Sequence, residues 1–275
     1  MGVVTVAMLR TQLRERAWEW ISRNDDSFRA DGEAADTHAF IKRTAELATV
    51  AEVLAHNGDA RGREMVETCW KRFECGAALA RVAHFPAVVT AYVPFYRQGL
   101  RDAKLETALA ASAHSATTPD VRLLVACALR ACELPSPWDL EELLAASIIG
   151  QRPPSWRITD RDAYVITHVI LYLAPTNALS NEHRNYLRRT LPVWIAIFGR
   201  AQHVDLVAEL VMAAHALGDC VAHPEWSILC DAQEADGLVV FRSDWRGRVP
   251  PEQRFANNYH STLVAFAACV MCTHN

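Results

Sequence analysis

The chain has 275 residues, of which 51% are hydrophobic and 22% charged, and its formal net charge at pH 7 is −4. This composition supplies enough apolar residues for a sizeable core and is unlike that of a disordered chain. The small negative charge gives no electrostatic reason to expect binding to nucleic acid or to an anionic membrane. Apolar runs stop short of the roughly 18–20 residues that a membrane-spanning helix needs, and residues 1–8 lack the basic start of a signal peptide. We therefore expect a cytoplasmic protein.

Apolar residues recur at three- and four-residue spacing along most of the chain, whereas the alternation typical of strands is scarce. In chain order, this spacing predicts helices over residues 6–22, 35–55, 63–82, 103–112, 120–132, 140–149, 160–173, 181–197, 204–217, 224–233 and 259–271. Two segments read as loops: 151–156, with two prolines, and 236–258. The second is long enough to be a lid or a binding element. The fold class that follows is all-α.

Four of the predicted helices begin close to an Asp or Asn and are apolar on nearly every side. These residues are Asp120, Asp162, Asp205 and Asn258, spaced by 42, 43 and 53 residues. A helix that is apolar all round is buried, and amphipathic helices such as 181–197 alternate with these four. The alternation indicates stacked helical hairpins in one domain over 1–275, either as an open solenoid or closed into an α/α toroid. In a toroid, the starts of the inner helices would share one mouth.

Two segments near the end of the chain carry a resemblance to known toroids. Residues 226–241, with Gln233, Gly237 and then Phe241, resemble the Gln–Gly–Trp (QW) repeat of squalene-hopene-cyclase-type proteins, in which the glutamine ties an outer helix to the next turn. Residues 258–262 resemble the Asp-x-Tyr-His-Thr stretch of protein prenyltransferase β subunits, whose histidine is a zinc ligand and corresponds to His260. Together the two resemblances imply a closed toroid.

The catalytic motifs of those two families are missing from the sequence. It has neither the Asp-x-Asp-Asp motif of class II terpene cyclases nor an Asp-Asp-x-x-Asp motif for magnesium diphosphate. The Asp-x-Cys that would complete a prenyltransferase zinc site with His260 is also missing. We therefore expect no metal and no cofactor, and we expect neither terpene cyclisation nor prenyl transfer.

The pattern of Asp162, Tyr164, His168 and Tyr172, together with the stretch 259–264, is similar to a family of small actinobacterial proteins of natural-product biosynthesis that includes aziridine-forming proteins. This resemblance implies a cyclase- or lyase-type enzyme of secondary metabolism. Such an enzyme would catalyse metal-independent ring closure or elimination on a small substrate, for example aziridine formation with loss of sulfate.

The candidate catalytic residues are polar groups on helices that are otherwise apolar. His168 lies on such a helix, where a neutral imidazole can accept a proton, and Tyr164 and Tyr172 at i−4 and i+4 share its face. The alternative for His168 is a core histidine bonded to a carbonyl. For Asp162, a helix N-cap is the alternative to catalysis.

Asp205 and Glu209, at i and i+4, place two carboxylates on one face of another apolar helix, which suits acid–base catalysis or binding of an amine. Asp205 also has an N-cap interpretation, whereas Glu209 has apolar neighbours and favours a functional role. Tyr259 and His260, directly after the long predicted loop, are candidates for substrate binding.

A non-catalytic helical-repeat protein that binds a partner or carries a ligand fits the same fold. Apolar residues on a nominally outer helix leave room for a small partner subunit; they are Trp194, Ile195, Ile197 and Phe198. Most of the eight cysteines lie in helical patterns rich in Ala, Leu and Val, so we interpret them as buried thiols. Cys269 and Cys272, followed by His274, have the spacing of a metal knuckle but lack a second pair.

Overall fold

The computed structural model of the chain describes residues 5–29, 37–219 and 223–272. All regular structure in these ranges is helical, with fourteen α-helices and six short 3₁₀ helices. Extended segments pair within these ranges at two isolated bridges, His203 with Arg242 and Gln233 with Val239. The all-α prediction is therefore confirmed. None of the helices described is long and apolar enough to cross a membrane.

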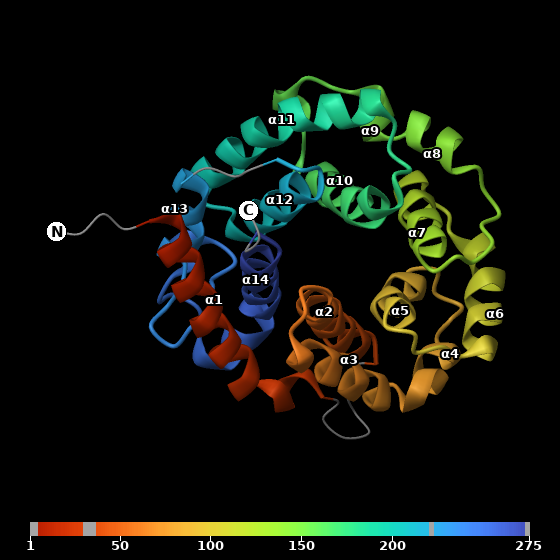
Figure 1. Cartoon of the computed structure of the whole chain (residues 1–275), viewed down its shortest axis with the longest axis horizontal. Coiled ribbons are helices and arrows are strands. Elements are labelled where there is room, and N and C mark those ends of the chain that lie inside the picture. Colours follow the sequence, from red (N-terminus) through yellow and green to blue (C-terminus); the bar gives the residue numbers. More distant parts are fainter. Residues whose placement is uncertain (1–4, 30–36, 220–222, 273–275) are drawn as a thin grey trace. The chain divides into compact units, whose positions relative to one another are not determined.

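The chain divides into two compact units, which we describe separately. Unit 1 comprises Met1–Phe28 and Asn185–Asn275, and unit 2 comprises Arg29–Arg184. Helix α11 (Asn181–Arg200) crosses the boundary between them (Figure 1). The prediction of one domain over 1–275 stays a prediction.

Unit 2 is a series of helices that pack on their neighbours along the chain (Figure 1). Its helices are α2 (Thr37–His56), α3 (Ala60–Arg72), α4 (Ala77–Arg81), α5 (Val88–Arg97), α6 (Ala103–Ser112), α7 (Pro119–Ala131), α8 (Leu140–Ala146), α9 (Ile148–Gln151) and α10 (Asp160–Leu173). Helix α2 packs against α3 and α5, α5 against α7, and α7 against α8 and α10. The turn between α2 and α3 lies at Asn57–Asp59, in the gap between the helices predicted over 35–55 and 63–82.

Three predictions for unit 2 are wrong in detail. The helix predicted over 63–82 breaks after Arg72, where Glu74, Cys75 and Gly76 have positive φ angles of 51°, 53° and 100°. The helix predicted over 140–149 breaks at Ser147, whose hydroxyl accepts a hydrogen bond from the backbone N–H of Ile149. No helix was predicted over Val88–Arg97, where the structure has α5 with Pro94 inside it.

Unit 1 is built around α12 and α14. Its complete helices are α1 (Val6–Arg23), α12 (Val204–Ala216), α13 (His223–Asp231) and α14 (Pro251–Met271). Helix α14 packs against α1 and α12, and α13 packs against the same two helices. Every residue of α12 from Val204 to Ala214 is buried, which confirms the all-round burial predicted for this helix.

The loop predicted over 236–258 is wrong in its second half. Helix α14 begins at Pro251, directly after Pro250, so a proline pair that reads as a loop marks a helix start. Asn258 consequently lies inside α14 and does not begin it. The first half of the segment remains irregular, with one 3₁₀ turn at Ser243–Trp245.

The partner surface expected on α11 is smaller than the sequence indicates. Trp194, Ile195 and Phe198 are buried, whereas Val193 and Ile197 are 44% and 41% exposed. The first three therefore contribute to the core and leave two apolar side chains, at i and i+4, on the exposed face.

The thiols near the C-terminus are buried. Burial raises the pKa of Cys269 well above its ordinary value, and Cys272 is also buried. A protonated, enclosed thiol is the behaviour expected of a structural cysteine. The third member of the predicted knuckle, His274, lies outside the described residues.

Candidate functional site

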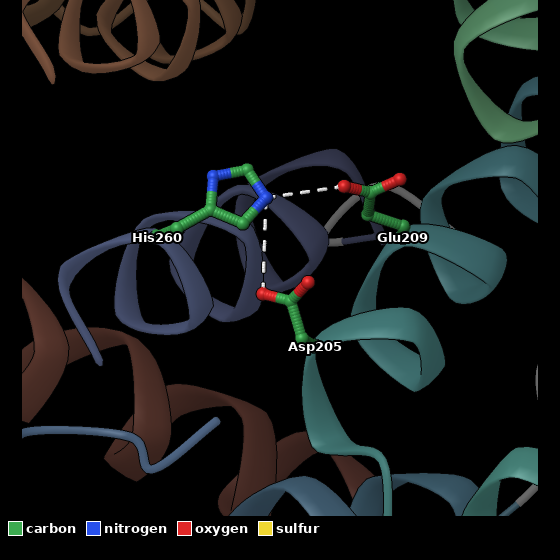
Figure 2. Close-up of side chains that lie close together, drawn as sticks. All are labelled: Asp205, Glu209 and His260. Carbon is green, nitrogen blue, oxygen red and sulfur yellow. Dashed lines mark hydrogen bonds and ion pairs between the residues drawn. The ribbon is translucent and has the colours of Figure 1, made fainter. Parts of the chain in front are cut away.

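Helix α12 carries two buried carboxylates on one face. His203 occupies the N-cap position and Asp205 is the second residue of the helix, so the N-cap interpretation of Asp205 is wrong. One helical turn later, Glu209 faces the same side (Figure 2). The two residues are 1% and 2% exposed, respectively. Carboxylates so well enclosed need opposite charge or hydrogen bonds nearby.

Helix α14 is oriented by hydrogen bonds to the irregular segment before it. The Ser261 hydroxyl donates to the carbonyl of Val239 (2.7 Å), and the N–H of Val239 donates to the Thr262 hydroxyl (3.0 Å). The side-chain oxygen of Asn258 accepts from the N–H of Phe241 (2.9 Å). These three α14 side chains therefore face the segment, and the 100° step per residue turns the side chain of residue 260 to the opposite face.

The same segment also holds the start of α12. The backbone N–H of Val204 donates to the carbonyl of Phe241 (3.1 Å), and His203 forms a bridge with Arg242. The rings of His203 and Phe241 pack edge to face, with centroids 4.8 Å apart. One short segment thus sets the positions of the first turn of α12 and the middle of α14.

This arrangement brings His260 between the two carboxylates (Figure 2). Its Nε2 lies 3.2 Å from Oε1 of Glu209 and 3.7 Å from Oδ1 of Asp205. One ligand-type atom from each of the three residues lies within 4.8 Å of those from the other two. The His260 side chain is 27% exposed, so it is the accessible member of the cluster. We call Asp205, Glu209 and His260 the α12–α14 cluster.

The cluster has the charge and composition of a site that takes up protons or cations. Its two carboxylates carry two negative charges when ionised, and a protonated imidazole neutralises one of them. The carboxylates stabilise an imidazolium at these distances because opposite charges attract strongly in a site shielded from water. Proton acceptance and cation binding are therefore the two kinds of chemistry that the arrangement favours.

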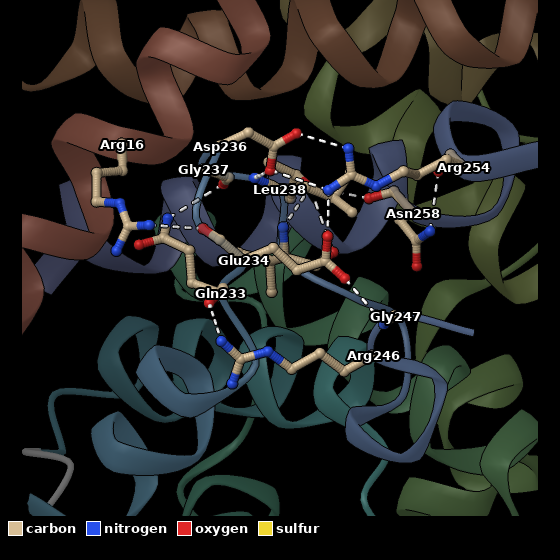
Figure 3. Close-up of polar contacts among 12 residues, drawn as sticks. Arg16, Gln233, Glu234, Asp236, Gly237, Leu238, Arg246, Gly247, Arg254 and Asn258 are labelled. Atoms are coloured by element: carbon tan, nitrogen blue, oxygen red, sulfur yellow. Dashed lines mark hydrogen bonds and ion pairs between the residues drawn. The ribbon is translucent and has the colours of Figure 1, made fainter. Parts of the chain in front are cut away.

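A second layer of polar contacts supports the segment that positions the cluster (Figure 3). The guanidinium of Arg254 donates to both carboxylate oxygens of Asp236 (2.7 and 3.1 Å) and also to Glu234. Burial opposes ionisation of Asp236, but the bonds from Arg254 and from the N–H of Leu238 outweigh it and lower the pKa of this carboxyl. These contacts attach the start of α14 to the turn that contains Glu234 and Asp236, which precedes the segment Leu238–Phe241.

Gln233 connects this turn to α1 (Figure 3). Its side-chain N–H₂ donates to the carbonyls of Leu13 (3.0 Å) and Gly237 (3.1 Å). Gly237 has a φ of 100°, and a Cβ at this position would lie 2.0 Å from the carbonyl oxygen of Arg16. The link that the QW resemblance implies for a glutamine and a nearby glycine is present; the family resemblance itself stays a prediction.

The predicted site residues of α10 belong to unit 2. Asp162 lies in the first turn, where its carboxylate accepts hydrogen bonds from the backbone N–H (2.9 Å) and hydroxyl (2.7 Å) of Thr159. The Thr159 hydroxyl in turn accepts from the N–H of Asp162, which completes a capping box. Asp162 therefore has the structural capping role that was its alternative, although it is the third helical residue and not the N-cap.

Tyr164, His168 and Tyr172 form a partly exposed stripe on α10. Val165, Ile166, Val169 and Ile170 on the other faces are buried, so α10 is not buried all round as predicted. His168 is partly exposed, and the alternative of a core histidine bonded to a carbonyl stays open. The catalytic role of His168 and the substrate-binding roles of Tyr164 and Tyr172 stay predictions.

Tyr259 has a packing role. Its ring stacks on Phe255 at a centroid distance of 5.4 Å and meets Phe28 edge to face at 5.9 Å. The side chain is 7% exposed and holds the end of the α1 region against α14. Tyr259 therefore adjoins His260 in the chain but packs into an aromatic cluster, and its role in substrate binding stays a prediction.

Sequence reasoning missed the residues that position the cluster. Asn258 was interpreted as a helix start, and Ser261 and Thr262 were noted only as part of a resemblance. The apolar run from Leu238 to Phe241 is the signal that indicates a buried extended segment inside the predicted loop.

One family model matches the chain. It is described as a domain of unknown function, DUF6895, and matches residues 14–270. Neither a curated protein nor a solved structure shows a significant match.

Proposed function

The chain belongs to the DUF6895 family, and from the geometry of its α12–α14 cluster we propose that it is a cytoplasmic enzyme that removes a proton from a small substrate. The observation that carries the proposal is His260, partly exposed, with Nε2 3.2 Å from Glu209 and 3.7 Å from Asp205. A base held by carboxylates on an otherwise apolar helix pair is suited to general acid–base catalysis.

The different roles that we propose for the three residues follow from how far each is buried. Asp205 and Glu209 are enclosed and hold the imidazole in one orientation, so a substrate meets His260 first. When the ring accepts a proton, the imidazolium faces both carboxylates and is stabilised by them. Groups that are already in place need little reorganisation during the reaction, which is the main source of electrostatic catalysis.

The reaction class that we propose is ring closure or elimination, and its support is the resemblance to aziridine-forming proteins. In ring closure, the base takes the proton of a substrate N–H or O–H. The electron pair of that nitrogen or oxygen then forms a new bond to a carbon of the same substrate. The bond between this carbon and the leaving group breaks, and its electrons depart with the leaving group as an anion such as sulfate. In elimination, the proton comes from a C–H and its electron pair forms a double bond. Both reactions release the acid of the leaving group.

The closure of the hairpins into an α/α toroid is part of the proposal. Its support is the resemblance of residues 226–241 to a QW repeat and the bonds of Gln233 to Leu13 and Gly237.

The experiment that tests the proposal replaces the gene in the native host. A deletion strain is complemented with the wild-type gene, with Glu209→Gln or with Glu252→Gln, which changes an exposed carboxylate on α14. We expect the deletion and Glu209→Gln strains to accumulate a precursor. The mass of this precursor should exceed that of the missing product by the mass of the leaving group's acid. The Glu252→Gln strain should match the wild type.

The alternative function, a non-catalytic binding or carrier protein, predicts a different result. Deletion would then lower the amount of a metabolite without accumulation of a precursor of this mass, and Glu209→Gln at wild-type protein level would restore it. That outcome would overturn the enzymatic proposal.

A further inference from the structure

Three side chains from two helices present one nitrogen and two carboxylate donors to a common point in unit 1 (Figure 2). We propose that Asp205, Glu209 and His260 bind one divalent transition-metal ion. The inference rests on the same cluster as the proposed function but not on its chemistry. It also revises the expectation that the chain has no metal site. That expectation rested on the missing Asp-x-Cys motif as the source of co-ligands for His260.

The separations between the donors fit a shared ion. With metal–ligand bonds of about 2.1 Å, two ligands of a tetrahedral ion lie about 3.4 Å apart. The distances from His260 Nε2 to the two carboxylates are 3.2 and 3.7 Å, which lie on either side of this value. The largest separation among the three donor atoms is at most 4.8 Å. Side-chain shifts of less than about 1 Å would therefore complete the coordination.

The charge of the cluster also matches a divalent ion. Two ionised carboxylates and a neutral imidazole carry two negative charges, and Asp205 and Glu209 hold theirs at 1% and 2% exposure. Buried charges are costly unless a partner of opposite sign is close, and an M²⁺ ion balances this pair. The carboxylates offer oxygen and the imidazole offers nitrogen. This mixture suits zinc, cobalt, iron or manganese better than calcium or magnesium, which prefer oxygen ligands alone.

Three protein donors leave one position of a four-coordinate ion to a ligand from outside the cluster. Three protein ligands with one open position are typical of catalytic zinc sites, whereas structural zinc sites use four. His260 is 27% exposed and offers the ion a route from solvent. The hydrogen bonds of Asn258, Ser261 and Thr262 to the segment Leu238–Phe241 fix α14, so the backbone that bears His260 is held in place before an ion binds.

Metal binding and proton transfer compete for the same nitrogen. A ligating imidazole must be neutral and use its lone pair for the ion. While the ion is bound, Nε2 of His260 cannot take part in proton transfer, so the metal-bound state excludes the acid–base state. If the proposed function holds, we therefore expect added metal to inhibit the metal-independent reaction.

The test is a cobalt titration of the purified full-length chain after removal of metals with EDTA and dialysis. Co²⁺ bound by nitrogen and oxygen donors gives weak visible absorption, whereas thiolate ligands add an intense near-ultraviolet band. We expect saturation at one ion per chain without the thiolate band. In Asp205→Asn and Glu209→Gln, the affinity should fall by more than the about 10–100-fold that loss of an outer-shell partner typically costs.

Two control variants distinguish metal binding at this cluster from metal binding at other histidine or carboxylate side chains of the chain. His215→Asn removes a histidine near the end of α12, and Glu252→Gln removes an exposed carboxylate on α14. Both should bind cobalt as the wild type does. The wild-type melting temperature should rise with Zn²⁺, and this rise should vanish in the two cluster variants, whose metal-free helicity by circular dichroism should be unchanged. The amide replacements keep the size of the side chains, so these variants retain the fold.

Three results would overturn the metal site: no saturable binding to the wild type, a thiolate band at saturation, or unchanged affinity in both cluster variants. None of them affects the proposed enzyme, whose activity is measured with EDTA present. Conversely, an activity that EDTA abolishes and metal restores would overturn the metal-independent reaction and leave the site in place.

Discussion

Glu209 is the residue whose functional interpretation gains most from the structure. Its apolar sequence neighbours favour a functional role, and it is 2% exposed with its carboxylate next to His260. The structure changes the interpretation of Asp205 more, because its sequence position favours an N-cap role. The helix begins at Val204 with His203 as its N-cap, so Asp205 is the second helical residue and its carboxylate lies 3.7 Å from His260 on α14. An N-cap at Asp205 would require the helix to begin two residues later.

A carboxylate in unit 2 provides a pH-dependent prediction at the residue scale. Glu52 on α2 is 7% exposed, and burial raises its pKa, although Arg97 at 3.7 Å opposes the shift. Between the ordinary and the raised pKa, the folded state binds more protons than the unfolded state. The free energy of unfolding therefore falls as pH rises through this window, and the loss persists at neutral pH.

We expect Glu52→Gln to raise the free energy of unfolding at pH 7 by about 1 kcal/mol and to have less effect below pH 4.5, the ordinary pKa of the group. Denaturant unfolding at several pH values measures the difference. Glu67→Gln, on an exposed face of α3, is the control and should change little at any pH. Greater destabilisation by Glu52→Gln at pH 7 than at pH 4 would contradict the prediction.

At the scale of elements, the segment from Leu238 to Ser243 organises unit 1. It is bonded to α14 through three side chains and to the start of α12 through backbone groups. The turn before it is attached to α1 through Gln233 and the two backbone carbonyls that this side chain satisfies. Buried backbone acceptors that lose their donor cost about 1–3 kcal/mol.

Gln233→Ala should therefore lower the free energy of unfolding by about 1–3 kcal/mol, because the carbonyls of Leu13 and Gly237 lose a donor. Chemical denaturation followed by circular dichroism measures the change. Gln253→Ala, on the exposed side of α14, should be neutral within about 0.5 kcal/mol. Equal effects of the two substitutions would show that the Gln233 link contributes nothing to stability.

Prediction from sequence succeeds where local signals are complete. Helix α10 begins and ends where periodicity places it, at Asp160 and Leu173, because Thr159 and Asp162 supply a full capping box. The start of α14 was missed because two prolines read as a loop. Helix α5, which has Pro94 inside it and packs against α2 and α7, was not among the predicted helices.

The individual residues of the candidate site could be predicted from the sequence, but their meeting at one place in the structure could not. Spacing at i and i+4 places Asp205 and Glu209 on one face, and the resemblance singled out His260. That these three meet depends on hydrogen bonds between Asn258, Ser261 and Thr262 and a segment 17–23 residues earlier. No helical or strand period encodes such bonds, so the sequence alone could not bring α12 and α14 together.

At the scale of the whole molecule, the proposed closure of the hairpins into a ring can be tested by the size of the molecule in solution. A compact chain of this length has a radius of gyration of about 19 Å. We expect small-angle X-ray scattering of the purified chain to give a value close to this one. An open stack of hairpins is elongated, so a clearly larger radius with an extended tail in the distance distribution would contradict ring closure.

The central claim is that the α12–α14 cluster removes a proton in an enzymatic reaction. Its most direct test uses the precursor that accumulates in the deletion strain, incubated with purified protein and EDTA and followed by mass spectrometry. We expect the wild type to convert it to a product lighter by the acid of the leaving group, and Glu209→Gln to do so at least about 100-fold more slowly at an unchanged melting temperature. Equal rates for the two proteins, or no conversion by the wild type, would contradict the claim.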